Sequence, residues 1–157
     1  MTTRAIVLGG GGPVGIAWES GLLAGLAECG IDVSNADSII GTSAGSAVGA
    51  QLAMGRRPAQ LHAAVAADSA RTDASPTRGN AGNTPAPDLT PLMTFMQRAA
   101  TGDADPVELR REIGAFALSA PTMSEEAYIA TFGQALAGAD SWPHPGYQCT
   151  AVDALTG

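Results

Sequence analysis

The apolar positions in the first part of the chain alternate between short runs and helical stripes. Residues 5–8 and 38–40 are short apolar runs that contain β-branched side chains, which is the pattern of buried strands. The apolar residues of segment 15–29 recur mainly on one helical face, and a second helix is expected over residues 44–54. Strand–helix–strand–helix order is typical of a parallel sheet with right-handed crossovers, so we expect an α/β fold.

The middle of the chain contains a segment that lacks large apolar side chains. An alanine-rich helix is expected from about Pro58, and residues 69–88 then contain no Leu, Ile, Val, Met or aromatic residue. Such a segment has nothing to bury, so we expect a flexible loop there. Two interpretations stay open for it, a lid or binding loop and a tolerated surface insertion.

Helices are expected again further along. Leu92 and Met96 recur at helical spacing, which fits either a helical core or the wall of an acyl tunnel, and Asp105 before Pro106 is a helix-start signal. Residues 147–152 have the pattern of a strand, which a parallel-sheet protein would cover with a further element. We therefore expect residues 1–157 to be the N-terminal part of a single domain that is truncated on its C-terminal side.

Composition and charge exclude several classes of function. The 157 residues include eight Arg, no Lys and fifteen acidic residues, giving a net charge of −7, and only 4% are aromatic. A nucleic-acid partner is not expected, because the charge repels phosphates and few rings could stack on bases. Cys29 and Cys149 have no ligand-spaced partners, so we expect packing cysteines, no metal and no cofactor. Without an apolar run of transmembrane length or a signal segment, we expect a cytoplasmic protein, with peripheral membrane contact as an additional expectation.

A Gly-x-Ser-x-Gly motif follows the second predicted strand, with Ser43 between Gly41 and Gly45. In a strand–turn–helix context this motif predicts a nucleophile elbow, in which the serine hydroxyl points out of a sharp turn. The amide of Ala44, at the start of the following helix, would then face an oxyanion that forms near the serine. The alternative is a plain tight turn between a strand and a helix.

A run of four glycines, residues 9–12, follows the first predicted strand, and two functions are compatible with this glycine run. Gly10, Gly12 and Gly15 match the dinucleotide fingerprint G-x-G-x-x-G, which also needs an acid at the end of the second strand. That strand ends in Gly-Thr-Ser instead, and Asp37 precedes it, so dinucleotide binding is a remote alternative. The other use is an oxyanion hole, because carboxyl ends of neighbouring parallel strands lie together and would bring these amides to the serine.

Three stretches resemble the patatin-like phospholipases: AIVLGGGG at 5–12, GLLAGL at 21–26 and IIGTSAGS at 39–46. The resemblance is strong over residues 4–55, about a third of the chain, and resumes weakly at 150–157. It implies a three-layer α/β/α fold and hydrolysis of lipid acyl esters by a Ser–Asp dyad without histidine. By position it makes Ser43 the nucleophile. It also implies an oxyanion hole built from the amides of Gly10, Gly11, Gly12 and Val14.

The chain departs from the family pattern at two places. Val14 stands where the family usually has Arg or Lys, so a cation beside the oxyanion is missing. The family's catalytic Asp is followed by glycine, whereas no Asp of this chain is, and Asp153 precedes Ala154. We therefore expect the base to come from outside these residues, either from the remainder of the same domain or from another chain. His144 and Asp153 are the weaker alternatives within the chain.

Three other polar side chains have structural interpretations. His62 is expected on the surface of a helix, His144 in a proline-flanked surface turn, and Glu19 as a solvated or capping residue of the helix after the glycine run. The expected function is a serine acyl hydrolase of lipid esters. The alternative from another class is a catalytically silent lipid-binding or interaction module with the same fold.

Overall fold

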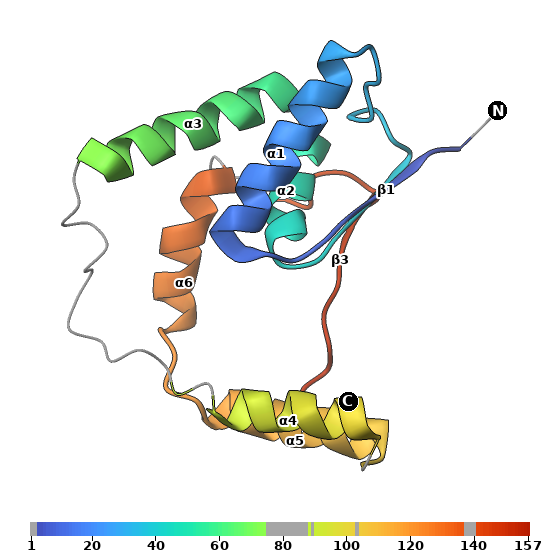
Figure 1. The fold of residues 1–157 in the computed structure, drawn as a ribbon, viewed down its shortest axis with the longest axis vertical. Coiled ribbons are helices and arrows are strands. Elements are labelled where there is room, and N and C mark those ends of the chain that lie inside the picture. Colours follow the sequence, from blue (N-terminus) through green and yellow to red (C-terminus); the bar gives the residue numbers. More distant parts are fainter. Residues whose placement is uncertain (1–2, 75–87, 89, 103, 137–140) are drawn as a thin grey trace. The chain divides into compact units, whose positions relative to one another are not determined.

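The computed structural model describes residues 3–74, 88, 90–102, 104–136 and 141–157 (Figure 1). The elements, in chain order, are β1 (Ala5–Leu8), α1 (Gly12–Glu28), β2 (Ser38–Gly41), α2 (Ala44–Ala53), α3 (Pro58–Ala74), α4 (Thr90–Thr101), α5 (Pro106–Ser119), α6 (Glu125–Phe132), the 3₁₀ helix η2 (Gly133–Leu136) and β3 (Tyr147–Cys149). They divide into two compact units. The described residues up to 74 and those of 126–150 form the larger unit, and those of 88–125 and 151–157 form the smaller one.

The larger unit is built on a parallel sheet with strand order β1-β2-β3. Leu8 pairs with Gly41 at the carboxyl end of the first two strands, and Gly41 pairs with Cys149 of the third. Because parallel strands run in the same direction, the turns that follow β1 and β2 meet at one edge of the sheet. The expected α/β class with a mainly parallel sheet is confirmed.

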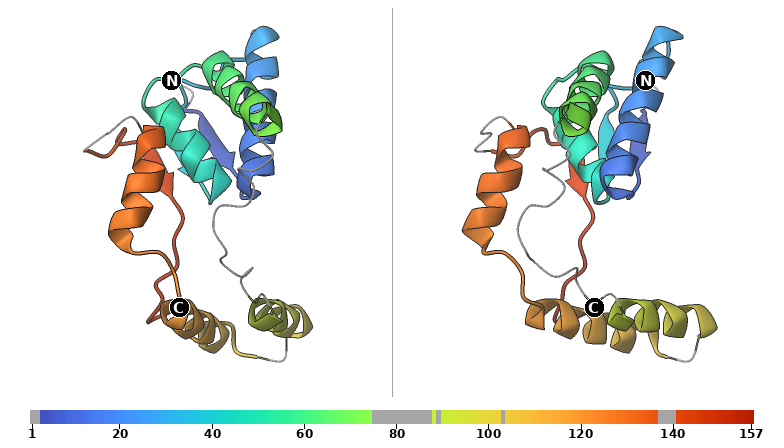
Figure 2. Two further views of the ribbon diagram at one scale, coloured as in Figure 1. Left: turned by 90° about the vertical axis from the view of Figure 1, so that its left-hand side faces the viewer. Right: turned by 60° about the vertical axis from the view of Figure 1, so that its left-hand side comes forward.

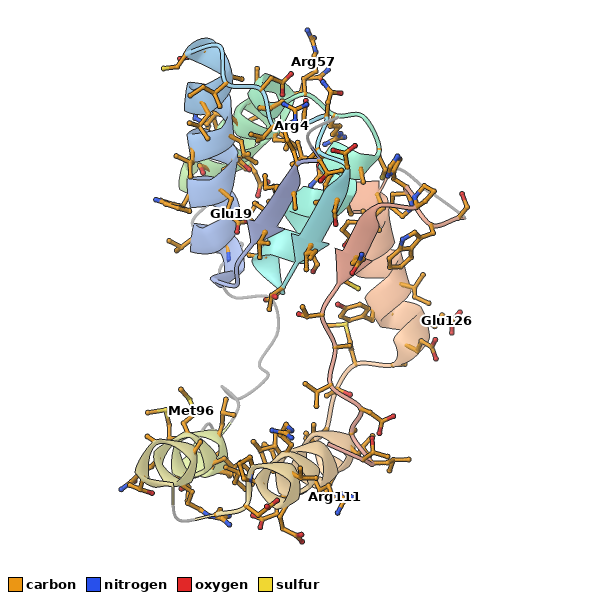
Figure 3. All side chains as sticks on the ribbon, turned by 90° about the vertical axis from the view of Figure 1, so that its right-hand side faces the viewer. Arg4, Glu19, Arg57, Met96, Arg111 and Glu126 are labelled. Carbon is orange, nitrogen blue, oxygen red and sulfur yellow. The ribbon has the colours of Figure 1, made fainter. Side chains whose placement is uncertain are left out.

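One face of this sheet carries the helices. Leu8, Ile39 and Tyr147 face α1 and α2 and are at most 7% exposed, and they pack in one core with Val48 and Leu61. The views in Figure 2 show α1, α2 and α3 on the same side of the strands. On the opposite face Val7 is 74% exposed, and no described helix of this unit lies over it (Figure 3). Of the three expected layers, the described residues of this unit contribute the sheet and one helical layer.

Two helices of the larger unit begin or end at residues other than those expected. Helix α1 begins at Gly12 instead of residue 15, because Gly11 adopts a φ of 154° at the N-cap and Pro13 favours a first helical turn. Helix α3 continues to Ala74, so residues 69–74 are helical where a loop was expected. Extending an existing helix needs no new nucleus, and no Gly or Pro interrupts this segment. Residues 75–87 of the expected loop lie outside the described residues.

Strand β3 is shorter than the strand expected over residues 147–152. It ends at Cys149, and the Thr150 amide adds one further hydrogen bond to the Gly41 carbonyl at 2.9 Å. Beyond it, Val152 is 66% exposed, and Asp153 begins a turn by accepting hydrogen bonds from the Leu155 and Thr156 amides. The apolar Val152 therefore led to a predicted strand that is longer than β3.

The smaller unit consists mainly of α4 and α5. Phe95 and Phe116 make an edge-to-face contact with ring centroids 6.0 Å apart, and Arg98 forms an ion pair with Glu112. The predicted start of α5 is confirmed, because Asp105 Oδ1 accepts from the Val107 amide at 2.9 Å and from the Glu108 amide at 3.0 Å. The apolar stripe of α4 is not a buried core: Leu92 is 38%, Met93 63% and Met96 59% exposed.

Candidate active site

Ser43 occupies a strained position in the turn between β2 and α2. Its backbone has φ 52° and ψ −112°, and it is the only non-glycine residue with a positive φ in the described part of the chain. Conformations of this kind cost about 1–3 kcal/mol and persist only where the surrounding structure holds them. The Ser43 side chain is exposed at the start of α2, which is the arrangement that a nucleophile elbow requires.

The two glycines of the motif are needed because backbone passes close to both of them. A Cβ on Gly41 would lie 2.5 Å from the Gly45 carbonyl oxygen. A Cβ on Gly45 would lie 2.4 Å from the carbonyl group of Leu8, in the neighbouring strand. Because main-chain atoms cannot move aside as a flexible side chain can, neither position has room for a larger residue. The glycines thus allow the elbow to pack directly against the end of β1.

The glycine run lies beside the elbow, as the parallel sheet predicts. The Gly45 amide donates to the Gly9 carbonyl at 2.8 Å, and the Thr42 amide donates to the Leu8 carbonyl at 3.0 Å. A Cβ placed on Gly10 would lie 3.7 Å from the Cβ of Ser43. The backbone around Gly10 therefore faces the serine directly.

The amide donors near Ser43 come from the N-termini of two helices. In α1 the Gly15 amide donates to the Gly11 carbonyl, so the Gly12 and Val14 amides precede the first helical hydrogen bond and have no partner within the helix. Both therefore belong to a helical turn, whereas the sequence placed them in a loop. The Ala44 amide stands at the corresponding place in α2. The positive ends of both helix dipoles favour negative charge at this edge of the sheet.

A pocket of about 520 Å³ opens next to Ser43 within the larger unit. Most of its lining is apolar or small, and none of the lining side chains is a carboxylate or an imidazole. The lining comprises Gly12, Pro13, Ile16, Ser43, Ala44, Ser46, Ala47, Ala50, Gln51, Tyr128, Leu136 and Tyr147. Alanines on α2 leave the space that larger residues would occupy. The pocket suits an extended apolar group better than a charged one.

Tyr147, at the wall of this pocket, was not recognised as a site residue in the sequence. Its hydroxyl donates to the Ser46 carbonyl at 2.8 Å, and its ring lies 5.1 Å from that of Trp142. Burial raises the pKa of the Tyr147 hydroxyl, so the ring remains neutral near pH 7. Only a strand position and an aromatic residue were visible in the sequence, because the contact joins residues 101 positions apart.

None of the candidate bases within the chain lines the pocket at Ser43. His62 is exposed on α3, and His144 lies in the turn before β3, where its Nδ1 accepts from the Gly146 amide at 2.9 Å. Asp153 belongs to the smaller unit, and its Oδ1 is engaged by two backbone amides. The hydrogen bonds of Asp153 lower its pKa, so it is ionised near neutral pH.

Two other expectations about titratable side chains are wrong. Cys29 and Cys149 are exposed rather than packed. Cys29 follows the last turn of α1, and Cys149 is the last residue of β3. Glu19 is neither solvated nor a cap: it is only 5% exposed, and burial raises the pKa of its carboxyl. Its place on the helical stripe, three residues after Ile16 and four before Leu23, was the available signal that it faces inward.

Asp37 does not lie where a dinucleotide site would need it. Its Oδ2 accepts from the Arg4 amide at 2.8 Å, at the amino end of the sheet and opposite the glycine run. No group of acidic, histidine or cysteine side chains in the described ranges could hold a metal ion. No described helix is both long and apolar enough to cross a bilayer.

A serine in a sharp turn that faces a glycine run at the edge of a parallel sheet is an arrangement typical of α/β hydrolases. The sequence profile of the patatin-like phospholipases matches residues 6–140, and the chain therefore belongs to this family. Searches of curated proteins and of solved structures returned no significant match. The family acts in general as lipid acyl hydrolases, which agrees with an apolar pocket at the serine.

Proposed function

We propose that this chain is the nucleophile-bearing part of a serine acyl hydrolase that cleaves lipid esters. The observation that supports the proposal most directly is the positive φ of Ser43 at the start of α2, next to an apolar pocket. An ordinary turn between a strand and a helix does not require a strained serine, nor flanking glycines whose surroundings have no room for a Cβ atom. The family membership points to the same reaction.

In the proposed reaction the Ser43 hydroxyl attacks the ester carbonyl carbon and gives its proton to a base. The bond from that carbon to the alcohol oxygen then breaks, and the alcohol leaves with a proton. Water next attacks the acyl-serine, releasing the fatty acid and restoring the hydroxyl. The base in this proposal is an aspartate outside the present residues, since no acid or imidazole is among the described residues that line the pocket.

The proposed oxyanion hole uses backbone amides instead of a side-chain cation. The donors are the amides of Gly10, Gly11, Gly12 and Val14, together with that of Ala44. Because residue 14 is a valine, the Val14 amide would act without a cationic side chain beside it. Each well-aimed donor is worth roughly 10²–10³ in kcat. The acyl chain would occupy the pocket between α2 and α6, where Ala47, Ala50 and Leu136 contribute apolar surface.

Labelling with a fluorophosphonate tests the hydrolase directly. We expect one covalent adduct per chain on Ser43 and none in Ser43→Ala. Ser69→Ala is the matched control, because Ser69 is an exposed serine on α3 outside the pocket lining, and its loss should leave the adduct in place. An adduct that persists in Ser43→Ala contradicts the assignment of the nucleophile. Activity against esters of different chain lengths then defines the substrate, and vesicle flotation tests the proposed peripheral membrane contact.

A second candidate function is a lipid-binding or interaction module without catalysis. It is favoured by two observations: the described lining of the pocket includes no acid or imidazole, and Val14 stands in place of a cation. In that case the folded protein would take up a fluorescent fatty acid but give no adduct, and Ser43→Ala would bind as the wild type does. Labelling without saturable fatty-acid binding would contradict the module and favour the enzyme.

A further inference from the structure

Two side chains from β3 and the residue after it make hydrogen bonds to the turn that carries Ser43. The Tyr147 hydroxyl donates to the Ser46 carbonyl at 2.8 Å, and the Thr150 hydroxyl lies 2.9 Å from the Thr42 hydroxyl. One contact is therefore made directly before Ser43 in the chain, and the other is made three residues after it. The two contacts join positions 101 and 108 residues apart, so they form only when β3 is paired beside β2.

Ser46 connects the Tyr147 hydroxyl to the main chain of the serine. The Ser46 amide donates to the Ser43 carbonyl at 3.0 Å, and the Ser46 hydroxyl donates to the same oxygen at 2.5 Å. The Ala47 amide also donates to it, at 3.3 Å. The first turn of α2 is thus bonded to Ser43, and Tyr147 is bonded to that turn.

The ring of Tyr147 is fixed by its neighbours. It is 6% exposed and lies against α2 at Gly49, where a Cβ would be 3.3 Å from the tyrosine Cε2. The Trp142 ring lies 5.1 Å from it between centroids, and the Trp142 indole nitrogen donates to the Tyr147 carbonyl at 2.9 Å. A phenylalanine ring would fill the same space, so packing alone does not explain the hydroxyl.

We propose that Tyr147 and Thr150 are positioning residues, which hold the strained turn of Ser43 in place from the side of β3. The inference rests on the proposed function for its catalytic consequence. A φ of 52° persists only where the surrounding structure holds it. Main-chain hydrogen bonds from Thr42 and Gly45 hold the turn to the end of β1, and the two side chains add the restraint from β3. A shift of about 1 Å in a reacting geometry can reduce a rate 10²-fold.

Conservative variants separate the hydrogen bonds from the packing. Tyr147→Phe removes the hydroxyl and keeps the ring, and Thr150→Val replaces the hydroxyl by a methyl group. Thr150→Ser keeps the hydroxyl. Ser34→Ala is the matched control, because it removes a hydroxyl that donates to Asp32 Oδ1 at 2.6 Å, in the larger unit but in the loop before β2.

Amide hydrogen exchange measured by NMR tests the tyrosine contact without requiring activity. We expect Tyr147→Phe to exchange at Ser46 and Ala47 at least about fivefold faster, because the first turn of α2 opens more often. The amide of Leu23, buried in α1, should exchange at the wild-type rate, and Ser34→Ala should leave all three amides unchanged. Unchanged exchange at Ser46 and Ala47, or an equal acceleration at Leu23, overturns the role of Tyr147.

The threonine contact is tested in the same way and does not depend on whether Tyr147→Phe folds. Thr150→Val should exchange about threefold faster at the Thr42 amide, a smaller effect because water competes for these exposed hydroxyls. Thr150→Ser should restore the wild-type rate. In a Thr42→Val background, Thr150→Val should have no further effect at residue 42, because the contact is already lost. An equal effect in both backgrounds overturns the role of Thr150.

Fluorophosphonate labelling tests the consequence for the reaction. The maximal labelling rate constant of folded protein should fall about tenfold in Tyr147→Phe and about threefold in Thr150→Val. The half-saturating probe concentration should stay the same, because the Tyr147 ring still lines the pocket. Thr150→Ser and Ser34→Ala should be labelled at the wild-type rate.

A purely structural role would lower the fraction of protein that can be labelled and leave the rate constant of the folded molecules unchanged. A folded Tyr147→Phe protein labelled at the wild-type rate constant therefore overturns the proposal. A wild-type protein that is not labelled contradicts the proposed hydrolase instead. The exchange rates at Thr42 and Ser46 then still decide whether the side chains of Tyr147 and Thr150 hold the turn.

Discussion

The two units of the chain are held together by different kinds of interaction. The larger unit has a contiguous apolar core and several glycines that backbone or core side chains approach closely, among them Gly41, Gly45 and Gly49. The described residues of the smaller unit bury only Leu109 and Gly114 of α5, with the Ala154 carbonyl close to Gly114. Their other contacts include an aromatic pair, an ion pair, a helix cap and hydrogen bonds from Arg110 and Arg111 to the last carbonyls. All residues of the candidate site belong to the larger unit, where the apolar core and the closely packed glycines lie.

The difference explains where a strained serine can be maintained. An unfavourable φ persists only if neighbouring atoms leave no alternative, and close packing of main chain on main chain provides that constraint around Ser43. Interactions between exposed side chains are weaker and adjust more easily. The two units should consequently respond differently to the same class of mutation, and the predictions below test this difference. Trp18 and Trp142 both belong to the larger unit, so tryptophan fluorescence follows that unit and amide resonances of α4 and α5 follow the other.

The largest effect is expected from a single methyl group at the elbow. Gly45→Ala would place a Cβ 2.4 Å from the Leu8 carbonyl group, so the sheet or α2 must move. We expect a loss of about 3 kcal/mol in the free energy of unfolding of the larger unit, measured by urea with tryptophan fluorescence. Gly25→Ala on α1 is the control, because nothing lies within 4 Å of its Cβ position, and it should be neutral or stabilising. Equal stabilities of the two variants would contradict the close-packing account.

Truncating a large apolar side chain should lower the free energy of unfolding strongly in the larger unit and hardly at all in the smaller one. Leu61 is 2% exposed in the core, whereas Met96 on α4 is 59% exposed. Leu61→Ala should destabilise its unit by about 2–3 kcal/mol, while Met96→Ala should change stability by less than about 0.5 kcal/mol. Chemical denaturation followed by the two sets of probes measures both. A Met96→Ala protein as destabilised as Leu61→Ala would show that α4 is covered in solution.

The buried carboxyl of Glu19 should make the larger unit less stable as the pH rises. Burial raises its pKa in the folded state, so its contribution is fully present below the ordinary glutamate pKa of 4.5 and is lost as pH rises through the folded value. Glu19→Gln lacks this titration. The difference in Tm between Glu19→Gln and the wild type should therefore grow in favour of the variant from pH 4 towards neutral. A difference that does not vary with pH would contradict the burial effect.

The ion pair of the smaller unit should have the opposite and smaller dependence. The Arg98 guanidinium lowers the pKa of the Glu112 carboxyl, so this contribution is present above pH 4.5 and is lost as pH falls through the folded value. Both side chains are partly exposed, and salt screens exposed pairs. Arg98→Gln should slightly destabilise α4 and α5 near neutral pH, and the effect should vanish in 1 M NaCl. Amide exchange in the two helices measures it, and an effect that survives high salt would contradict it.

Local patterns allowed much of the larger unit to be predicted. The parallel arrangement, the sharp turn at Ser43 and the juxtaposition of the two glycine turns follow from short-range signals that all agree. Boundaries were less accurate, because the start of α1 at Gly12 depends on the conformation of Gly11, and α3 extends without burying apolar residues. The exposure of Met93 and Met96 was not predictable, because apolar residues at helical spacing do not reveal whether another element packs against that face of the helix.

The sequence by itself determined the class of fold, the family and the position of the serine. These depend on the order of strands and turns and on glycines, such as Gly41 and Gly45, whose surroundings have no room for a side chain. The tertiary structure alone decided which groups meet. Only folding brings the Tyr147 hydroxyl to the Ser46 carbonyl and buries Glu19, and no local periodicity encodes either result. The physical reason is that burial and hydrogen-bond partners belong to the packed arrangement, so a glutamate expected at the surface can be buried in the fold.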